Sequence, residues 1–189
     1  PTGWTRATRV PTLVVVGDVQ PEAVRAMAER YFGPLQASEV VPLKPAAEPE
    51  QTGETRVEVR VPARQPYVML GYKTPIVGRS DEPWEPYALF VLSSVLDGGE
   101  SARLARELVR GSGIAASAGA DYGTYGRLPG MLLLDGTPTD EHSVAEVENA
   151  LREAVARLRE ELIDEAELRR VVTQVVASKV FQADSLVYQ

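Results

Sequence analysis

The sequence predicts an α+β fold, a two-layer sandwich in which an antiparallel sheet has helices packed on one face. Two observations predict it. Strand and helix patterns follow one another in the order ββααββαα over residues 55–189. The first of these strands alternates between polar and apolar residues, and each helix carries a single apolar stripe. One-sided strands and one-sided helices bury both of their apolar surfaces by stacking in two layers.

The first predicted elements are a strand and a helix. Residues 12–17 are β-branched and lack polar alternation, which predicts a fully buried strand. Pro21 suits the first position of a helix that extends to about Tyr31 and ends at Gly33-Pro34. Two elements are too few for a domain, so residues 1–36 are expected to be the end of a preceding domain. We expect strand 12–17 to lie outside the sheet of residues 55–137, with an exposed edge that invites pairing with another copy.

Residues 37–54 have the composition of a linker. They carry three prolines and a glycine, with Ala and Glu between them (Pro42, Pro45, Pro49 and Gly53). Such a segment is extended and semi-rigid. The predicted domains are therefore 1–36, the linker 37–54, and a domain over 55–189 that is truncated at its C-terminus.

The first half of the predicted domain is two strands and two helices. Residues 55–61 alternate, with Val57, Val59 and Val61 on one face, and residues 67–72 form the second strand. Helices are predicted over 86–96 and 101–110, and glycines at 111 and 113 end the second helix.

The second half repeats this order. Strands are predicted over 114–125 and 129–137, then a long helix over 144–162 with one apolar face. Asp164 and Glu167 resemble a capping box for a last helix over 165–179.

The charge pattern excludes two classes of partner. The chain of 189 residues has 20 basic and 27 acidic residues, a net charge of −7, and its basic residues are scattered among acidic ones. No basic stripe exists to follow a phosphate backbone, so we expect no nucleic-acid partner. No apolar run approaches the ~20 residues of a membrane span, so we expect no membrane partner.

The residue types argue against chemistry at this chain's own side chains. With one histidine, His142, and no cysteine, the chain lacks the ligands that a catalytic zinc normally needs, and its serines lack a triad base. The glycine-rich segments at 98–99 and 111–113 lack the Lys-Ser/Thr of a phosphate loop and are better explained as helix ends. We expect no catalytic residue, no metal ligand and no cofactor in the chain.

The tyrosines on the predicted strands leave two alternatives open. Tyrosines on strands usually fill a sheet face or its edge, and less often contact a bound peptide (here Tyr67, Tyr72, Tyr122 and Tyr125). An exposed strand edge can also bind an extended peptide through main-chain hydrogen bonds.

Several ordered segments resemble the pitrilysin-type (inverzincin) zinc metallopeptidases, the family of mitochondrial processing peptidase and insulin-degrading enzyme. The residues that carry the resemblance are Thr12-Leu13-Val14-Val15-Val16-Gly17-Asp18-Val19, Pro66-Tyr67-Val68-Met69-Leu70-Gly71-Tyr72, Leu96-Asp97-Gly98-Gly99-Glu100-Ser101-Ala102-Arg103-Leu104 and Asp164-Glu165-Ala166-Glu167-Leu168. The resemblance spans roughly residues 11–187. It implies that residues 55–189 are the second, inactive peptidase domain.

The resemblance also implies where a site would lie. The family's inverted zinc motif, His-x-x-Glu-His, is absent, so zinc is expected in the parent protein only. Some members have an Arg and a Tyr, seven positions apart, that bind substrate, and these positions correspond to Val109 and Ala116. Neither residue donates a charged or phenolic hydrogen bond, so a catalytic role is not carried over. The candidates for the wall of a substrate chamber are Val109, Gly111, Gly113, Ala116 and Tyr122.

Two functions are compatible with these observations. The first is a non-catalytic domain that positions peptide substrate beside a zinc-bearing domain of the same or a partner chain, in a homo- or heterodimer; the parent would be a zinc metalloendopeptidase of the bacterial periplasm or cytoplasm. The alternative is a stand-alone α+β module that binds a small molecule or a protein partner. A parent sequence with the zinc motif upstream would decide for the first.

Overall fold

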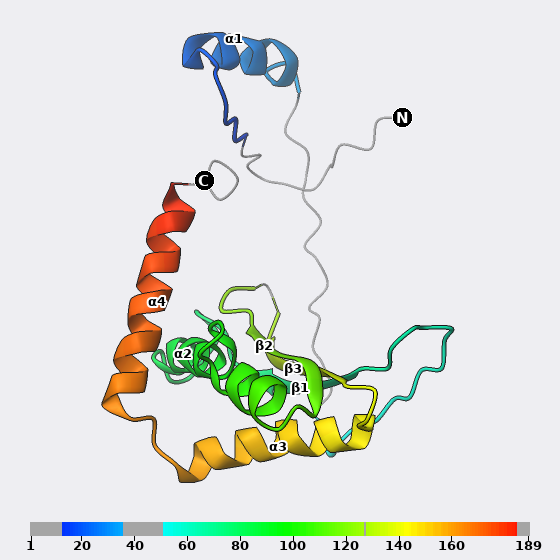
Figure 1. Ribbon diagram of the computed structural model, residues 1–189. Coiled ribbons are helices and arrows are strands. Elements are labelled where there is room, and N and C mark those ends of the chain that lie inside the picture. Colours follow the sequence, from blue (N-terminus) through cyan, green and yellow to red (C-terminus); the bar gives the residue numbers. More distant parts are fainter. Residues whose placement is uncertain (1–12, 36–50, 127, 185–189) are drawn as a thin grey trace. The chain divides into compact units, whose positions relative to one another are not determined.

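A computed structural model describes residues 13–35, 51–126 and 128–184 (Figure 1). The elements are α1 (Pro21–Phe32), β1 (Val68–Thr74), α2 (Glu85–Asp97), the π-helix η1 (Ala105–Gly111), β2 (Ala115–Tyr122), β3 (Gly130–Pro138), α3 (Val144–Glu160) and α4 (Glu165–Ala183). The chain divides into two compact units, Pro1–Gly53 with Val180–Gln189, and Glu54–Lys179. All three strands lie in the second unit.

The sheet is antiparallel, and its strand order is β1-β3-β2. Leu134 of the central strand pairs with Leu70 on one side and with Ala120 on the other. The outer edge of β2 is occupied by a side chain, because the Asp97 carboxylate at the end of α2 accepts a hydrogen bond from the Ala120 N–H at 3.1 Å. The antiparallel sheet predicted from the strand patterns is confirmed.

One face of the sheet shares a core with α2, η1 and α3, and Figure 1 shows α2 and α3 beside the sheet. Alternate residues of β3, including Leu132 and Leu134, are buried against side chains of α2, η1 and α3 such as Leu96 and Leu151. Gly136 allows α3 to approach closely, because a Cβ there would lie 2.5 Å from Cγ1 of Val147. The predicted α+β sandwich with helices on one sheet face is therefore confirmed.

The long helix α3 begins at a complete capping box. The Ser143 hydroxyl accepts a hydrogen bond from the Glu146 N–H, and the Glu146 carboxylate accepts one from the Ser143 N–H at 2.7 Å. Hydrogen bonds from the Ser143 backbone and hydroxyl lower the pKa of Glu146 to about 2. The helix ends at Glu160, two residues before the predicted end at 162.

The predicted strand at 12–17 is wrong over its described residues. Residues 13–16 form no strand, and all four side chains are exposed. Helix α1 forms as predicted from Pro21, but none of its residues is buried. A β-branched run becomes a strand only when another strand accepts its hydrogen bonds, and the described residues contain no such partner for it.

The predicted strand at 55–61 is also wrong. These residues form no ladder, and Val57, Val59 and Val61 are exposed. The start of the segment is fixed instead by ion pairs to α3, where Arg56 makes a bidentate contact with Glu148 at 2.9 and 2.7 Å. The pairing holds the segment beside a helix, so the alternating valines gain no sheet partner.

The capping box predicted for α4 is only half formed. The Glu167 N–H donates to the Asp164 carboxylate at 2.8 Å. The Glu167 side chain does not return to the helix start but binds Arg103, 64 residues earlier in the chain. No helix in the described part of the chain is both long enough and apolar enough to cross a membrane.

Candidate functional site

The helix that precedes β2 is a π-helix. The sequence predicts a helix over residues 101–110. In the structure, residues 105–111 form the π-helix η1. The Ser112 N–H donates to the Glu107 carbonyl, five residues back, at 2.8 Å. A π-turn contains one more residue than an α-turn, and such turns occur frequently at functional sites. Val109 lies in this widened turn and packs partly buried against the core.

A second irregularity lies at the start of β2. Ala115 pairs with Pro138 and Ser117 with Thr137, so Ala116 is an extra residue on β2, a β-bulge. The bulge leaves Ala115 buried while Ala116 and Ser117 are both exposed. Bulges re-aim side chains and are common beside active sites. Ala116 therefore points away from the core because of the bulge.

The loop between these irregularities is short and fixed. Gly113 has a φ of +68°, in the left-handed region that favours glycine. The Thr139 hydroxyl donates to the Gly113 carbonyl at 3.0 Å, and the Thr139 N–H donates to the Ile114 carbonyl at 3.1 Å. Gly111 ends η1 and is exposed. Four of the predicted chamber residues thus lie together on one π-helix, loop and bulge.

Tyr122, the fifth candidate, lies at the other end of β2. Its ring is buried in the core, and its hydroxyl donates to the Pro75 carbonyl at 2.6 Å. Burial raises the pKa of Tyr122 above its ordinary value of 10.0. Of the other tyrosines that the sequence places on strands, Tyr72 lies on β1 and packs partly buried against the core, whereas Tyr67 and Tyr125 lie outside the strands and are exposed.

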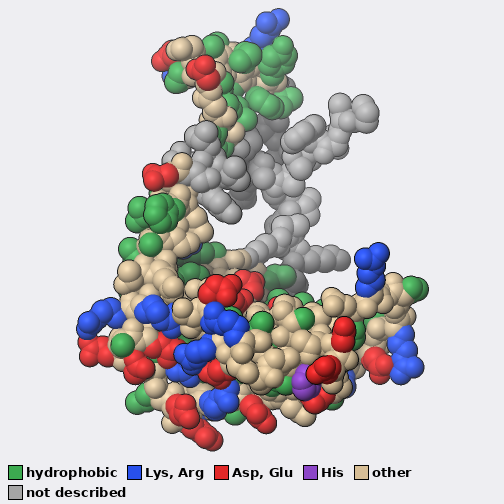
Figure 2. Space-filling model, in the orientation of Figure 1, with side chains coloured by type: hydrophobic (Ala, Val, Ile, Leu, Met, Phe, Trp, Pro, Cys, Tyr) green, Lys and Arg blue, Asp and Glu red, His purple; other side chains and the backbone are tan. Residues whose placement is uncertain are grey.

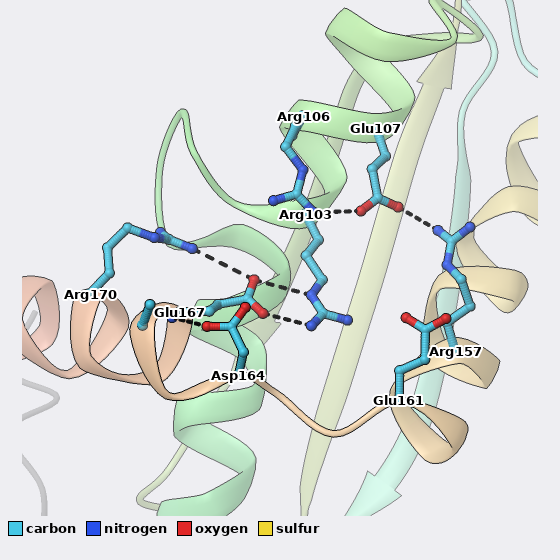
Figure 3. Close-up of a pocket in the computed structure, with 9 residues that line it drawn as sticks. Arg103, Arg106, Glu107, Arg157, Glu161, Asp164, Glu167 and Arg170 are labelled. Carbon is cyan, nitrogen blue, oxygen red and sulfur yellow. Dashed lines mark hydrogen bonds and ion pairs between the residues drawn. The ribbon is translucent and has the colours of Figure 1, made fainter.

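The helix layer contains a charged pocket of about 410 Å³ (Figure 3). Its walls come from the segment around η1, the end of α3 and the start of α4. The lining residues are Arg103, Arg106, Glu107, Arg157, Glu161, Asp164, Ala166, Glu167 and Arg170. Acidic and basic side chains are likewise interspersed over the face of the molecule in Figure 2.

The charges of this pocket largely bind one another. Arg103 makes a bidentate contact with Glu167, at 3.1 and 2.6 Å, and the two side chains are only 13% and 10% exposed. Glu107 pairs with both Arg106 and Arg157. Hydrogen bonding from Arg103 lowers the pKa of Glu167 and, reciprocally, raises that of Arg103. The arrangement ties helices together and shows no nucleophile beside a base.

The side chains do not fit a catalytic zinc. The described residues contain no group of three His, Cys, Asp or Glu side chains that could hold a metal ion. His142, the one histidine of the sequence, lies 3.2 Å from Glu146 at the start of α3. Zinc sites in proteins use three or four such ligands.

Residues 11–175 match the family model described as the peptidase M16 inactive domain. Among solved structures, a protease from Helicobacter pylori has a similar fold, with a TM-score of 0.78 and 24% sequence identity. The similarity covers 92% of this chain but only 41% of that protease chain. No curated protein matches the sequence.

Proposed function

We propose that this chain, which belongs to the peptidase M16 inactive-domain family, forms part of a substrate chamber and positions peptide for a zinc-bearing domain. Its sequence resembles the pitrilysin-type peptidases. A non-catalytic, peptidase-like domain is what the family itself establishes. We further propose that this domain lines a substrate chamber, that a peptide binds in the chamber, and that a zinc-bearing domain is its partner.

The observation that carries the proposal is the pair of backbone irregularities around one exposed loop. The π-turn at 105–111 and the bulge at Ala116 flank the glycines at 111 and 113. Both irregularities depart from regular geometry at a cost in hydrogen bonding. Their occurrence on either side of one loop supports a site there rather than elsewhere on the sheet.

The side chains of this loop restrict what the site can do. Val109 and Ala116 offer no charged or phenolic donor, so the contribution to a reaction is orientation of the peptide rather than stabilisation of a developing charge. The exposed residues are Gly111, Ser112, Ala116 and Ser117, and an extended peptide would meet main-chain groups of these residues other than the Ser112 N–H, which already donates to the Glu107 carbonyl. Tyr122 supports the strand from within the core.

The zinc-bearing domain would supply the chemistry. It would lie in the same polypeptide or in a partner chain, as a homo- or heterodimer, and the parent would be a zinc metalloendopeptidase. The 41% coverage of the H. pylori protease by this fold is consistent with a longer parent. We expect the 189-residue chain to retain no stoichiometric zinc after dialysis and to cleave no peptide. About one tightly held zinc per chain would contradict this.

Photo-cross-linking tests the proposed site. A benzophenone amino acid replaces Ala116 in one variant and Leu162 in the control, where the side chain is 96% exposed on the α3–α4 connection. Each variant is illuminated with an unfolded model peptide. We expect cross-linked peptide from position 116 at several times the yield from position 162. Equal yields would contradict the site, because the benzophenone is exposed in both variants.

A further inference from the structure

We infer that Arg103 and Glu167 are positioning residues whose ion pair holds the segment from η1 to Gly113 in the geometry that the proposed peptide site needs. The inference rests on the proposed function for its purpose, but its physical basis is separate. It joins the side chains of Arg103 and Glu167, which lie 64 residues apart in two sequence motifs. The contact is drawn in Figure 3.

The first step is that η1 has little packing of its own. Only Leu108 among its seven residues is buried, and Val109 is partly so. π-turns are rare and occur mostly as single turns within α-helices, so contacts with other elements are expected to help hold this one. Closing the turn to α-helical geometry would remove one residue from it. The residues that follow would then rotate by about 100° and move by about 1.5 Å along the axis.

The second step is that the external contacts come from both neighbouring helices. Arg103, two residues before η1, binds Glu167 of α4. Glu107, within η1, binds Arg157 near the end of α3. Glu107 also supplies the carbonyl that accepts the N–H and the hydroxyl of Ser112. A displacement of η1 toward α-helical geometry would therefore strain ion pairs to two helices at once.

The two ion pairs differ in strength. Arg103 and Glu167 are nearly desolvated and make two parallel hydrogen bonds, the geometry in which an ion pair is most specific. Glu107 and Arg157 are a third to a half exposed, so solvent screens their attraction. Arg103–Glu167 is thus the principal contact, and Glu107–Arg157 is the weaker one.

Amide hydrogen exchange of the 189-residue chain tests the inference. In Glu167→Gln we expect the amides of residues 105–114 to exchange about tenfold faster, while those of β3 keep their rates, because the segment opens locally. The matched control is Glu165→Gln on the same helix. Glu165 is 85% exposed and, among the residues that the structure describes, pairs with Arg169, so its removal should change these rates less than twofold.

Two outcomes of the Glu167→Gln experiment would overturn the inference. Unchanged exchange at 105–114 in Glu167→Gln would show that the pair holds nothing there. An equal rise at β3 would show that the pair stabilises the whole unit without positioning the loop. Arg157→Gln, at the weaker contact, provides a second test if Glu167→Gln does not fold. It should raise exchange about threefold in the same segment only, and no rise would also overturn the inference.

A cross-linking arm separates this inference from the proposed function. With benzophenone at position 116, Glu167→Gln should lower the yield of cross-linked peptide several-fold, and Glu165→Gln should not. If the benzophenone variant with Glu167 intact gave no cross-linked peptide, the proposed function would be contradicted. The exchange result would still support the positioning role of the ion pair. Cross-linking that is insensitive to Glu167→Gln, with unchanged exchange, would remove the positioning role and leave the proposed function intact.

Discussion

Strand β3 and residues 13–16 are similar in sequence and opposite in structure. Both are runs of large aliphatic residues of strand length. In β3, Leu134 is 0% exposed and has a strand on each side. In the N-terminal run, Val14 is 68% exposed and no ladder forms. An aliphatic run supplies the propensity for a strand, but the neighbouring strands that accept its hydrogen bonds decide whether one forms.

The largest expected effect tests this comparison directly. Leu134→Ala should lower the free energy of unfolding by about 3–4 kcal/mol, because it leaves a cavity at the centre of the core. Val14→Ala should change it by less than about 0.5 kcal/mol, because Val14 is exposed. Urea unfolding followed by circular dichroism measures both. Equal losses would show that the N-terminal run is buried in solution.

The bulge allows the same comparison between adjacent residues. Ala115→Tyr should lower the free energy of unfolding by about 2–3 kcal/mol, because Ala115 is buried against the core and has no room for a ring. Ala116→Tyr should be tolerated within about 0.5 kcal/mol, because the bulge exposes it. Thermal or urea unfolding of the two variants decides. The reverse order would place the extra residue elsewhere on β2.

The contribution of the nearly buried Arg103–Glu167 ion pair to stability should depend on pH, unlike that of an exposed ion pair. At pH 7, Glu167→Gln should lower the free energy of local opening of residues 105–114 by about 1.4 kcal/mol, which corresponds to the tenfold faster exchange expected there. The folded pKa of Glu167 lies below its ordinary value of 4.5, so its contribution is complete above that value and is lost as the pH falls further. The difference in local opening free energy of residues 105–114 between the unsubstituted chain and Glu167→Gln, measured by amide hydrogen exchange, should therefore shrink from pH 5 to pH 3. A constant difference would contradict the pairing.

The smallest expected effect compares two helix starts. Ser143→Ala should cost about 1 kcal/mol, because it removes the capping box of α3. Gln20, before α1, makes no side-chain cap, so Gln20→Ala should change stability by only a few tenths of a kcal/mol. Urea midpoints of the two variants distinguish them. A loss at Gln20 equal to that at Ser143 would show that Gln20 caps α1.

Periodicity predicted those elements whose partners are close by in the fold. The helices at 86–96 and 144–162 and the strand at 129–137 each have one apolar face, and each buries that face. The strand at 55–61 has the same alternation but no ladder, since alternation says which face would be buried and not what would cover it.

The site is less accessible to sequence reasoning. The resemblance singled out positions 109 and 116, but a π-turn and a bulge each arise from one extra residue and leave no compositional pattern. Arg103 and Glu167 both lie in segments that carry the family resemblance, yet no local pattern pairs residues 64 positions apart. The sequence predicts that the Glu167 side chain caps the start of its own helix, but in the structure it binds Arg103 across the pocket.

The Asp97 carboxylate on the outer edge of β2 has a consequence for solubility. An unpaired edge strand can recruit the strand of another molecule, and repetition of that event produces fibrillar aggregates. By binding the Ala120 N–H, Asp97 occupies a donor that an incoming strand would need and places a negative charge in its path. We therefore expect the Leu-Asp-Gly-Gly turn to oppose pairing of β2 with a strand of another molecule, as well as to end a helix.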